Sequence, residues 1–253
     1  MKKENPKYLY KYRPVNRHTL NMISSNEAYF SLPIDFNDPF DCNIVPEIIY
    51  TSEEFEIFVN SLKEREDGQV SQNEIKNLLE NPVETLEHNW KGTINNIRNN
   101  LRIFCLSAIN NNVMMYSHYA EGHKGICLEF LVSDDPFYGS LDYVRYTEKI
   151  PVFHPFNENQ NIIQKELMEI EVLTKACTWF YEEEWRIIKR GPNPFMYKFS
   201  PNILTSIIFG YQTSSDNKLL IERVINKRVP SIQLKEAFKK EKSFDLGIRP
   251  YKS

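Results

Sequence analysis

The chain contains little glycine, only 8 of its 253 residues. It has no Gly-x-Gly-x-x-Gly segment and no Gly-Lys-Ser/Thr segment, the glycine-rich patterns that cradle nucleotide phosphates. We therefore expect neither a Rossmann nor a P-loop nucleotide site.

Cysteine is also scarce, and the four cysteines do not have the spacing of a metal site. Cys42, Cys105, Cys127 and Cys177 are far apart and form no Cys-x-x-Cys pair. This excludes the usual zinc-site spacing, and a disulfide framework is not expected in a chain of this size. Cys105 and Cys127 lie in apolar runs, where cysteine acts as a small buried hydrophobic residue.

Long apolar runs are missing as well. None approaches the roughly 20 residues of a membrane helix, and residues 1–6 lack the apolar core of a secretion signal. The net charge of −3 argues against a strong electrostatic grip on nucleic acid. With 41% apolar and 26% charged residues, the chain is typical of a globular cytoplasmic protein without a membrane partner.

The order of predicted elements favours one α+β domain over residues 1–253. A helix is expected to start at Ser52 and to be broken at Asp67-Gly68, and the stretch at about 52–101 is predicted to be a helical insertion or lid. The other predicted helices are 16–24, 73–79, 83–101, 113–121, 160–176 and 217–227. Predicted strands are 8–13, 28–32, 102–107, 125–130, 142–146, 179–188, 194–200, 204–209, 231–238 and 244–249.

Residues 179–188, Trp-Phe-Tyr-Glu-Glu-Glu-Trp-Arg-Ile-Ile, are the most informative segment. As a strand, it would carry Glu182, Glu184 and Arg186 on one face and Glu183 on the other. Paired carboxylates of this kind suit general-base work or stabilisation of a cation. The alternative is a sheet edge whose charges are solvated or paired.

The first predicted strand, residues 8–13, contains two positively charged side chains. Lys11 and Arg13 share one face, and Tyr10 and Tyr12 share the other. Such cations could hold a phosphate or a carboxylate, or they could form a solvated edge.

Two further segments carry polar groups. Asn37, Asp38 and Asp41 could bind a metal or a ribose hydroxyl, although Asn and Asp more often cap turns through their own backbone. After Ser107, His118 and Tyr119 could form a site wall, with side chains that diverge because they occupy adjacent helix positions. His118 and His123 lack the i, i+4 spacing of a helical metal pair.

These clusters resemble, in order, the motifs of the bacterial DUF2971 domain proteins, and the resemblance extends over nearly the whole chain. One departure is Tyr116, where the family usually has Trp; the change keeps an aromatic side chain. The matching segments are Tyr10-Lys-Tyr-Arg13, Tyr29-Phe-Ser-Leu-Pro33, Phe36-Asn-Asp-Pro-Phe-Asp41, Phe104-Cys-Leu-Ser107, Met115-Tyr-Ser-His-Tyr-Ala120, Gly122-His-Lys-Gly125 and Trp179-Phe-Tyr-Glu-Glu-Glu-Trp-Arg186.

The motif order is also similar, more distantly, to that of the ADP-ribosyltransferases. That likeness implies a mixed or antiparallel split β-sheet core. It also implies a cation on an early strand (Arg13 or Lys11), a serine on a second strand (Ser31 or Ser107) and a late Glu-x-Glu, here Glu182-x-Glu184.

The resemblance implies an enzyme that consumes NAD by ADP-ribosyl transfer or hydrolysis, as a toxin or in anti-phage defence. Glu184 would stabilise the oxocarbenium-like cation and Glu182 would polarise the acceptor. A first-strand cation would hold the pyrophosphate, and Tyr119 or Tyr181 would stack on nicotinamide. The further candidates for NAD contacts are Asn37, Asp38, His118 and Arg186.

NAD is then the expected ligand and no metal is expected. The acceptor would be a protein or a nucleic acid, and an inhibitory partner or a homo-oligomer is possible. Two alternatives stay open. One is a metal-dependent nuclease that uses Asp38, Asp41, Glu182 and Glu184 with help from Lys175. The other is a non-catalytic binding or sensor module, whose carboxylates would be tied up in salt bridges.

Overall fold

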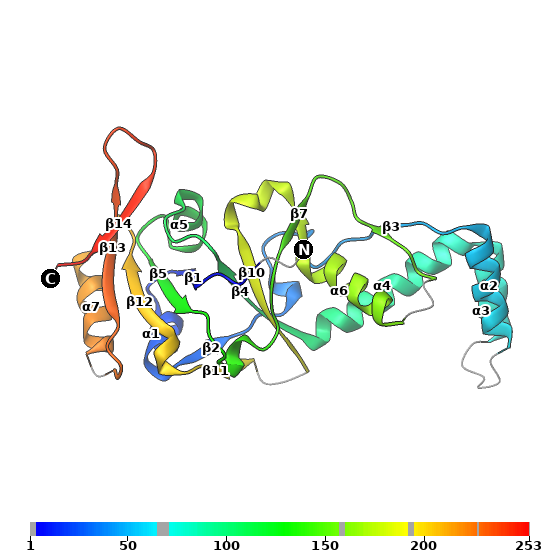
Figure 1. The fold of residues 1–253 in the computed structure, drawn as a ribbon, viewed down its shortest axis with the longest axis horizontal. Helices are drawn as coiled ribbons and strands as arrows, with labels where there is room; N and C mark the ends of the chain where they lie inside the picture. Colours follow the sequence, from blue (N-terminus) through cyan, green and yellow to red (C-terminus); the bar gives the residue numbers. More distant parts are fainter. Residues whose placement is uncertain (1–3, 65–70, 157–159, 192–194, 227, 253) are drawn as a thin grey trace. The chain divides into compact units, whose positions relative to one another are not determined.

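The computed structural model describes residues 4–64, 71–156, 160–191, 195–226 and 228–252. The chain divides into two compact units (Figure 1). The first comprises Met1–Leu32, Leu101–Val144 and Thr178–Ser253, and the second comprises Pro33–Asn100 and Arg145–Cys177.

The first unit is built on an eight-stranded mixed sheet, which confirms the predicted α+β class. The strand order is β14-β13-β12-β5-β1-β4-β10-β6; β12 and β13 are parallel and the other neighbours are antiparallel. The strands are β1 (Tyr8–Arg13), β4 (Leu101–Ser107), β5 (Ile126–Leu131), β6 (Leu141–Tyr143), β10 (Glu184–Arg190), β12 (Leu204–Phe209), β13 (Gln233–Lys239) and β14 (Leu246–Pro250). A separate two-stranded sheet pairs β2 (Glu27–Tyr29) with β11 (Met196–Lys198).

Each face of the large sheet is covered by helices. Met22 and Ile23 of α1 (Arg17–Ser25) and Ile221 of α7 (Ser215–Ile225) join the main apolar core with alternate strand residues such as Leu9 and Ile187. The other face packs a smaller cluster around Tyr12 and Cys127 against Met115, Tyr116 and Ala120, which belong to α5 (Val113–Tyr119) or directly follow it. Strand alternation therefore separates Leu9 from Tyr12, as period-2 patterning requires.

The sheet is weakly joined between β1 and β4. In the described residues one register pair, Tyr10↔Ser107, connects them, whereas β1 and β5 share six pairs and β4 and β10 share seven. Earlier in β4, Ser31 forms an isolated antiparallel bridge with Ile103. The two strands therefore part on the N-terminal side of Ser107, and a different segment pairs with the first half of β4.

The second unit holds the helices predicted at 52–101. They are α2 (Ser52–Lys63), α3 (Gln72–Glu80) and α4 (Pro82–Asn100), and capping boxes start α2 at Thr51 and α3 at Ser71. The expected break at Asp67-Gly68 lies outside the described residues. Trp90 and Ile94 of α4 pack with Ile170 of α6 (Gln160–Leu173). Short parallel pairs join β3 (Glu47–Ile48) to β8 (Val152–Phe153) and β7 (Arg145–Thr147) to β9 (Thr174–Ala176).

Short 3-10 helices complete both units: η1 (Pro33–Asp35), η2 (Pro136–Tyr138), η3 (Cys177–Glu182) and η4 (Pro201–Ile203). Two element predictions were wrong. The helix expected at 160–176 ends at Leu173, and the strand expected at 142–146 is divided between β6 and β7, which belong to different sheets.

No helix in the described ranges combines the length and apolar character needed to cross a bilayer. Cys127 is fully buried, as its apolar surroundings predict, and Cys105 is half-buried.

Candidate functional site

The predicted strand at 179–188 is interrupted at its centre. Residues 177–182 form the 3-10 helix η3, Glu183 has a positive φ of 40°, and β10 begins at Glu184. The prediction that Glu182 shares a strand face with Glu184 was therefore wrong, because the left-handed residue between them breaks the alternation. Glu184 and Arg186 lie within β10 and do share a face.

Ser107 fixes this junction. Its hydroxyl donates to the carbonyl oxygen of Glu182 at 2.6 Å, and its neighbour Ala108 donates a backbone N–H to the carbonyl oxygen of Glu183 at 3.0 Å. Ser107 is also the register partner of Glu184. The end of β4 thus holds the backbone in a turn that separates the two glutamates, and the Ser107 hydroxyl has a positioning role.

Arg186 clamps the carboxylate of Glu184. Its Nε donates to Oε1 at 2.9 Å and its Nη2 donates to Oε2 at 3.0 Å. Arg186 is fully buried and Glu184 is 5% exposed. A bidentate pair of this kind fixes both the orientation and the ionisation of the carboxylate, and it is stable in a buried place only while both charges are present.

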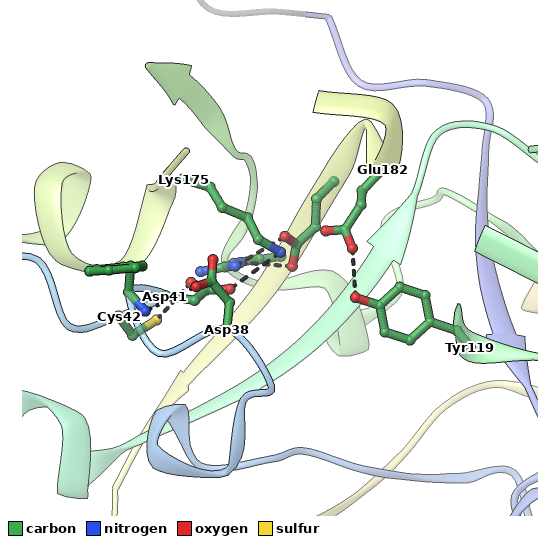
Figure 2. Close-up of polar contacts among 9 residues, drawn as sticks. Asp38, Asp41, Cys42, Tyr119, Lys175 and Glu182 are labelled. Atoms are coloured by element: carbon green, nitrogen blue, oxygen red, sulfur yellow. Dashed lines mark hydrogen bonds and ion pairs between the residues drawn. The ribbon is translucent and has the colours of Figure 1, made fainter. Parts of the chain in front are cut away.

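Tyr119, the last residue of α5, holds the carboxylate of Glu182. The Tyr119 hydroxyl donates to Oε1 at 2.6 Å, and Glu182 is 3% exposed. Figure 2 shows the two side chains pointing toward each other. The side chain of Asn112 donates to the carbonyl oxygen of Tyr181 at 2.8 Å and also accepts from the N–H of Met115 as the cap of α5. Residues at the two ends of α5 therefore hold η3: Asn112 binds the backbone of Tyr181, and Tyr119 binds the side chain of Glu182.

Lys11 lies where β1 and β4 part. Its ammonium donates to the carbonyl oxygen of Cys105 at 2.7 Å and stands 4.7 Å from the centre of the Phe104 ring. Burial lowers the pKa of Lys11, and Glu184 and Glu182 oppose that shift. Lys11 is therefore the first-strand cation that lies in the field of the carboxylates.

Arg13 has a different neighbour. Its Nε donates to the Thr19 hydroxyl at 3.4 Å, and burial lowers its pKa. The sequence left the choice between Lys11 and Arg13 open, and the effect of Glu184 and Glu182 on the pKa of Lys11 favours Lys11 as the cation near the glutamates.

The structure also separates the two candidate serines. Ser107 pairs with Glu184, whereas Ser31 pairs with Ile103, four residues earlier on β4. At about 3.3 Å per residue, Ser31 lies roughly 13 Å along the strand from Ser107.

Aromatic side chains surround the η3 segment. The ring of His118 lies 6.1 Å from that of Tyr181 at an interplanar angle of 25°, and 6.2 Å from that of Tyr119. His118 and Tyr119 therefore both contact this segment, and the expected divergence of their side chains was wrong. His118 remains exposed, and Tyr119 and Tyr181 are half-buried.

The remaining predicted residues belong to the second unit. Asn37 is exposed, whereas Asp38 is buried and its Oδ1 caps the N–H of Phe40 at 3.0 Å, the turn-capping role that was the commoner expectation. Asp41 forms a buried ion pair with Lys175, 3.4 Å between Oδ2 and Nζ, and Figure 2 shows these side chains pointing toward each other.

Sequence reasoning missed two polar side chains that the structure makes prominent. Asn112 supports η3, and its position directly before a predicted helix is the usual signal of a capping residue. Glu171 is fully buried 4.0 Å from Nε of Arg98, and burial raises its pKa to about 8. Nothing in the local sequence marks Glu171, because its burial results from non-local packing.

Metal ligands are not grouped in the part of the chain that the structure describes: no three His, Cys, Asp or Glu side chains there could hold one ion. The nuclease alternative, which needs such a group, gains no support from this geometry.

Residues 115–187 match the family model described as "Protein of unknown function (DUF2971)". The predicted resemblance to this family is therefore confirmed over a stretch that runs from α5 into β10 and includes Tyr119, Glu182 and Glu184. The motifs around Lys11, Ser31, Asp38 and Ser107 lie outside it. No curated protein and no solved structure matches the chain.

Proposed function

We propose that the protein consumes NAD, by ADP-ribosyl transfer or by hydrolysis, at the junction of η3 and β10. The observation that carries the proposal is the pair of buried glutamates, each held by its own donor, beside the place where β1 and β4 part. A carboxylate whose orientation is fixed before the substrate binds is what stabilisation of a developing cation requires.

Glu184 is the proposed cation-stabilising residue. The bond between the nicotinamide nitrogen and the anomeric carbon breaks with its electron pair leaving on nicotinamide, and the ribose becomes oxocarbenium-like. Arg186 keeps Glu184 ionised and oriented. The two hydrogen bonds from Arg186 take the place of water molecules around the Glu184 carboxylate, which would otherwise have to reorient during the reaction.

Glu182 is the proposed base for the acceptor. A water molecule, or a hydroxyl or amine of a macromolecule, forms the new bond to the anomeric carbon, and its proton passes to Glu182. The short hydrogen bond from Tyr119 orients that carboxylate. Lys11 would attract the NAD pyrophosphate, and the rings of Tyr181 and His118 offer stacking surface for nicotinamide. A cytoplasmic toxin or anti-phage effector is the setting that the family resemblance supports.

The test is incubation of the purified protein with NAD, followed by mass spectrometry of free nicotinamide and of the protein and added nucleic acid. Released nicotinamide with free ADP-ribose indicates hydrolysis, and a mass gain on a macromolecule indicates transfer. Glu182→Gln should lose activity while the same change at the neighbouring half-buried Glu183 should not. Equal turnover by both variants would contradict the assigned role of Glu182.

A second candidate, a module that binds NAD without cleaving it, is favoured by one specific observation. The ion pair between Glu184 and Arg186 is the arrangement expected of a non-catalytic site. Calorimetric binding of NAD without nicotinamide release would favour this module over the enzyme.

A further inference from the structure

A row of polar side chains crosses four strands of the large sheet away from β10. Tyr10 is the register partner of Glu129, Glu129 of Ser206, and Ser206 of Gln233. Directly opposed residues in adjacent strands point to the same face. These four side chains therefore line one face of the sheet from β1 to β13.

A groove of about 340 Å³ lies along this part of the first unit. Its size is that of a site for one small molecule. It is lined by Tyr8, Glu129, Asn202, Leu204, Thr205, Pro230, Ser231, Gln233 and Lys235.

The charges in the groove cancel. The Oε2 of Glu129 accepts from Nζ of Lys235 at 2.8 Å, and its Oε1 accepts from the Thr205 hydroxyl at 3.0 Å. Glu129 is 6% exposed, so the carboxylate lies at the base of the groove. A balanced pair of charges gives little attraction to an ion, but it offers an acceptor and a donor side by side.

Ser206 lies in the same polar row but is buried behind the residues that line the groove. Its hydroxyl lies between Glu129 and Gln233 in the row, is fully buried, and has no hydrogen-bond partner in the described part of the chain. Buried hydroxyl groups are normally satisfied, and an exception calls for a ligand, a water molecule or another explanation.

We propose that this groove binds the vicinal diol of a small neutral sugar or nucleoside. Adjacent hydroxyl groups can donate to Glu129 and accept from Lys235 at once, and the Gln233 amide can do both. The ring of Tyr8 offers an apolar face to the C–H side of a sugar. Both candidate ligands share the diol and differ in whether a base is attached.

Saturation-transfer NMR on the full-length protein tests the proposal with D-glucose, adenosine and 2′,3′-dideoxyadenosine as probes. The variant Gln233→Ala removes an exposed groove side chain, and Gln212→Ala, an exposed glutamine outside the groove, is the matched control. Glu129→Gln removes the charge at the base of the groove and serves as a second test.

We expect glucose or adenosine to bind with a Kd of about 1 mM, and Gln233→Ala to weaken binding by about tenfold while Gln212→Ala does not. Binding of adenosine alone assigns the groove to nucleosides, and binding of glucose alone assigns it to free sugars. The proposal fails if neither probe binds, if the dideoxy analogue binds as well as adenosine, or if Gln233→Ala has no effect. None of these residues belongs to the proposed NAD site, so the two proposals stand or fall separately.

Discussion

The contact between Glu184 and Arg186 links the stability of the folded protein to the proposed chemistry, because Glu184 takes part in both. Two opposite charges leave water together, and their bidentate hydrogen bonds offset the cost of desolvation. Removing one of them takes a hydrogen-bonded opposite charge away from the other, which stays buried. A function of Glu184 must therefore be separated experimentally from its effect on folding.

The substitution Glu184→Gln should lower the free energy of unfolding by about 3 kcal/mol, because Arg186 keeps its charge in a fully buried position. Urea unfolding measures the effect. The double variant Glu184→Gln/Arg186→Met should recover part of the loss, and a single variant as stable as the wild type would contradict a coupled pair.

Glu171 makes stability depend on pH. Burial raises its pKa to about 8 in the folded protein, well above its usual value of 4.5, so the folded state holds this proton more tightly than the unfolded chain does. The stabilisation is complete below about pH 4.5 and is lost as the pH rises through about 8. The free energy of unfolding should fall over this window by up to about 5 kcal/mol.

Glu171→Gln should remove that pH dependence, since an amide does not titrate. Glu166→Gln on the same helix is the matched control, because Glu166 is only half-buried. Melting curves between pH 5 and 9 compare the two. An unchanged pH profile in Glu171→Gln would rule out Glu171 as its source.

The loop after α5 depends on a close contact between Gly125 and the backbone of Arg13 at the end of β1. A Cβ placed on Gly125 would lie 2.3 Å from the carbonyl oxygen of Arg13, far inside van der Waals contact. The N–H of Gly125 bonds to the carbonyl oxygen of Ala120 at 2.8 Å, and its own carbonyl accepts from the N–H of Gly210 at 2.9 Å. The loop thus docks against the end of β1 only because residue 125 has no side chain.

Gly125→Ala should destabilise the first unit by about 2 kcal/mol or more, since the backbone of β1 cannot yield easily. Gly92→Ala is the informative control, because Gly92 lies within α4 and a Cβ there meets nothing within 4 Å. That variant should gain up to about 1 kcal/mol from helix propensity. Chemical unfolding of both variants checks the contrast, and a neutral Gly125→Ala would refute the steric argument.

Local sequence signals predicted most helices and strands, but not the 3-10 helix η3, which carries Glu182. Helices α2 and α3 carry capping residues and spaced apolar side chains, so their starts were predictable. The segment 179–188 has the aromatic and β-branched content of a strand. It turns at Glu183 because Ser107 and Ala108, distant in sequence, bind its backbone. Propensity could predict β10 from Glu184 onward, but not the preceding 3-10 helix.

At the scale of the whole molecule, the two units are each assembled from separated stretches of chain. The parallel pairs β3–β8 and β7–β9 bring residues 145–153 and 174–176 into the unit that holds the predicted helices. Such pairings depend on non-local contacts, which no local pattern encodes. The sequence therefore predicted the α+β class and several candidate residues, while the partners of Lys11, Asp41 and Glu171 required the structure.

The most direct test of the central proposal is the rate of nicotinamide release from NAD by the full-length protein and two matched variants. The wild type and Glu183→Gln should release nicotinamide at similar rates, and Glu184→Gln should be slower by about a hundredfold or more per folded molecule. The folded fraction is measured under the same conditions, because the lost ion pair also lowers stability. No release by the folded wild type, or full release by folded Glu184→Gln, would contradict the proposal.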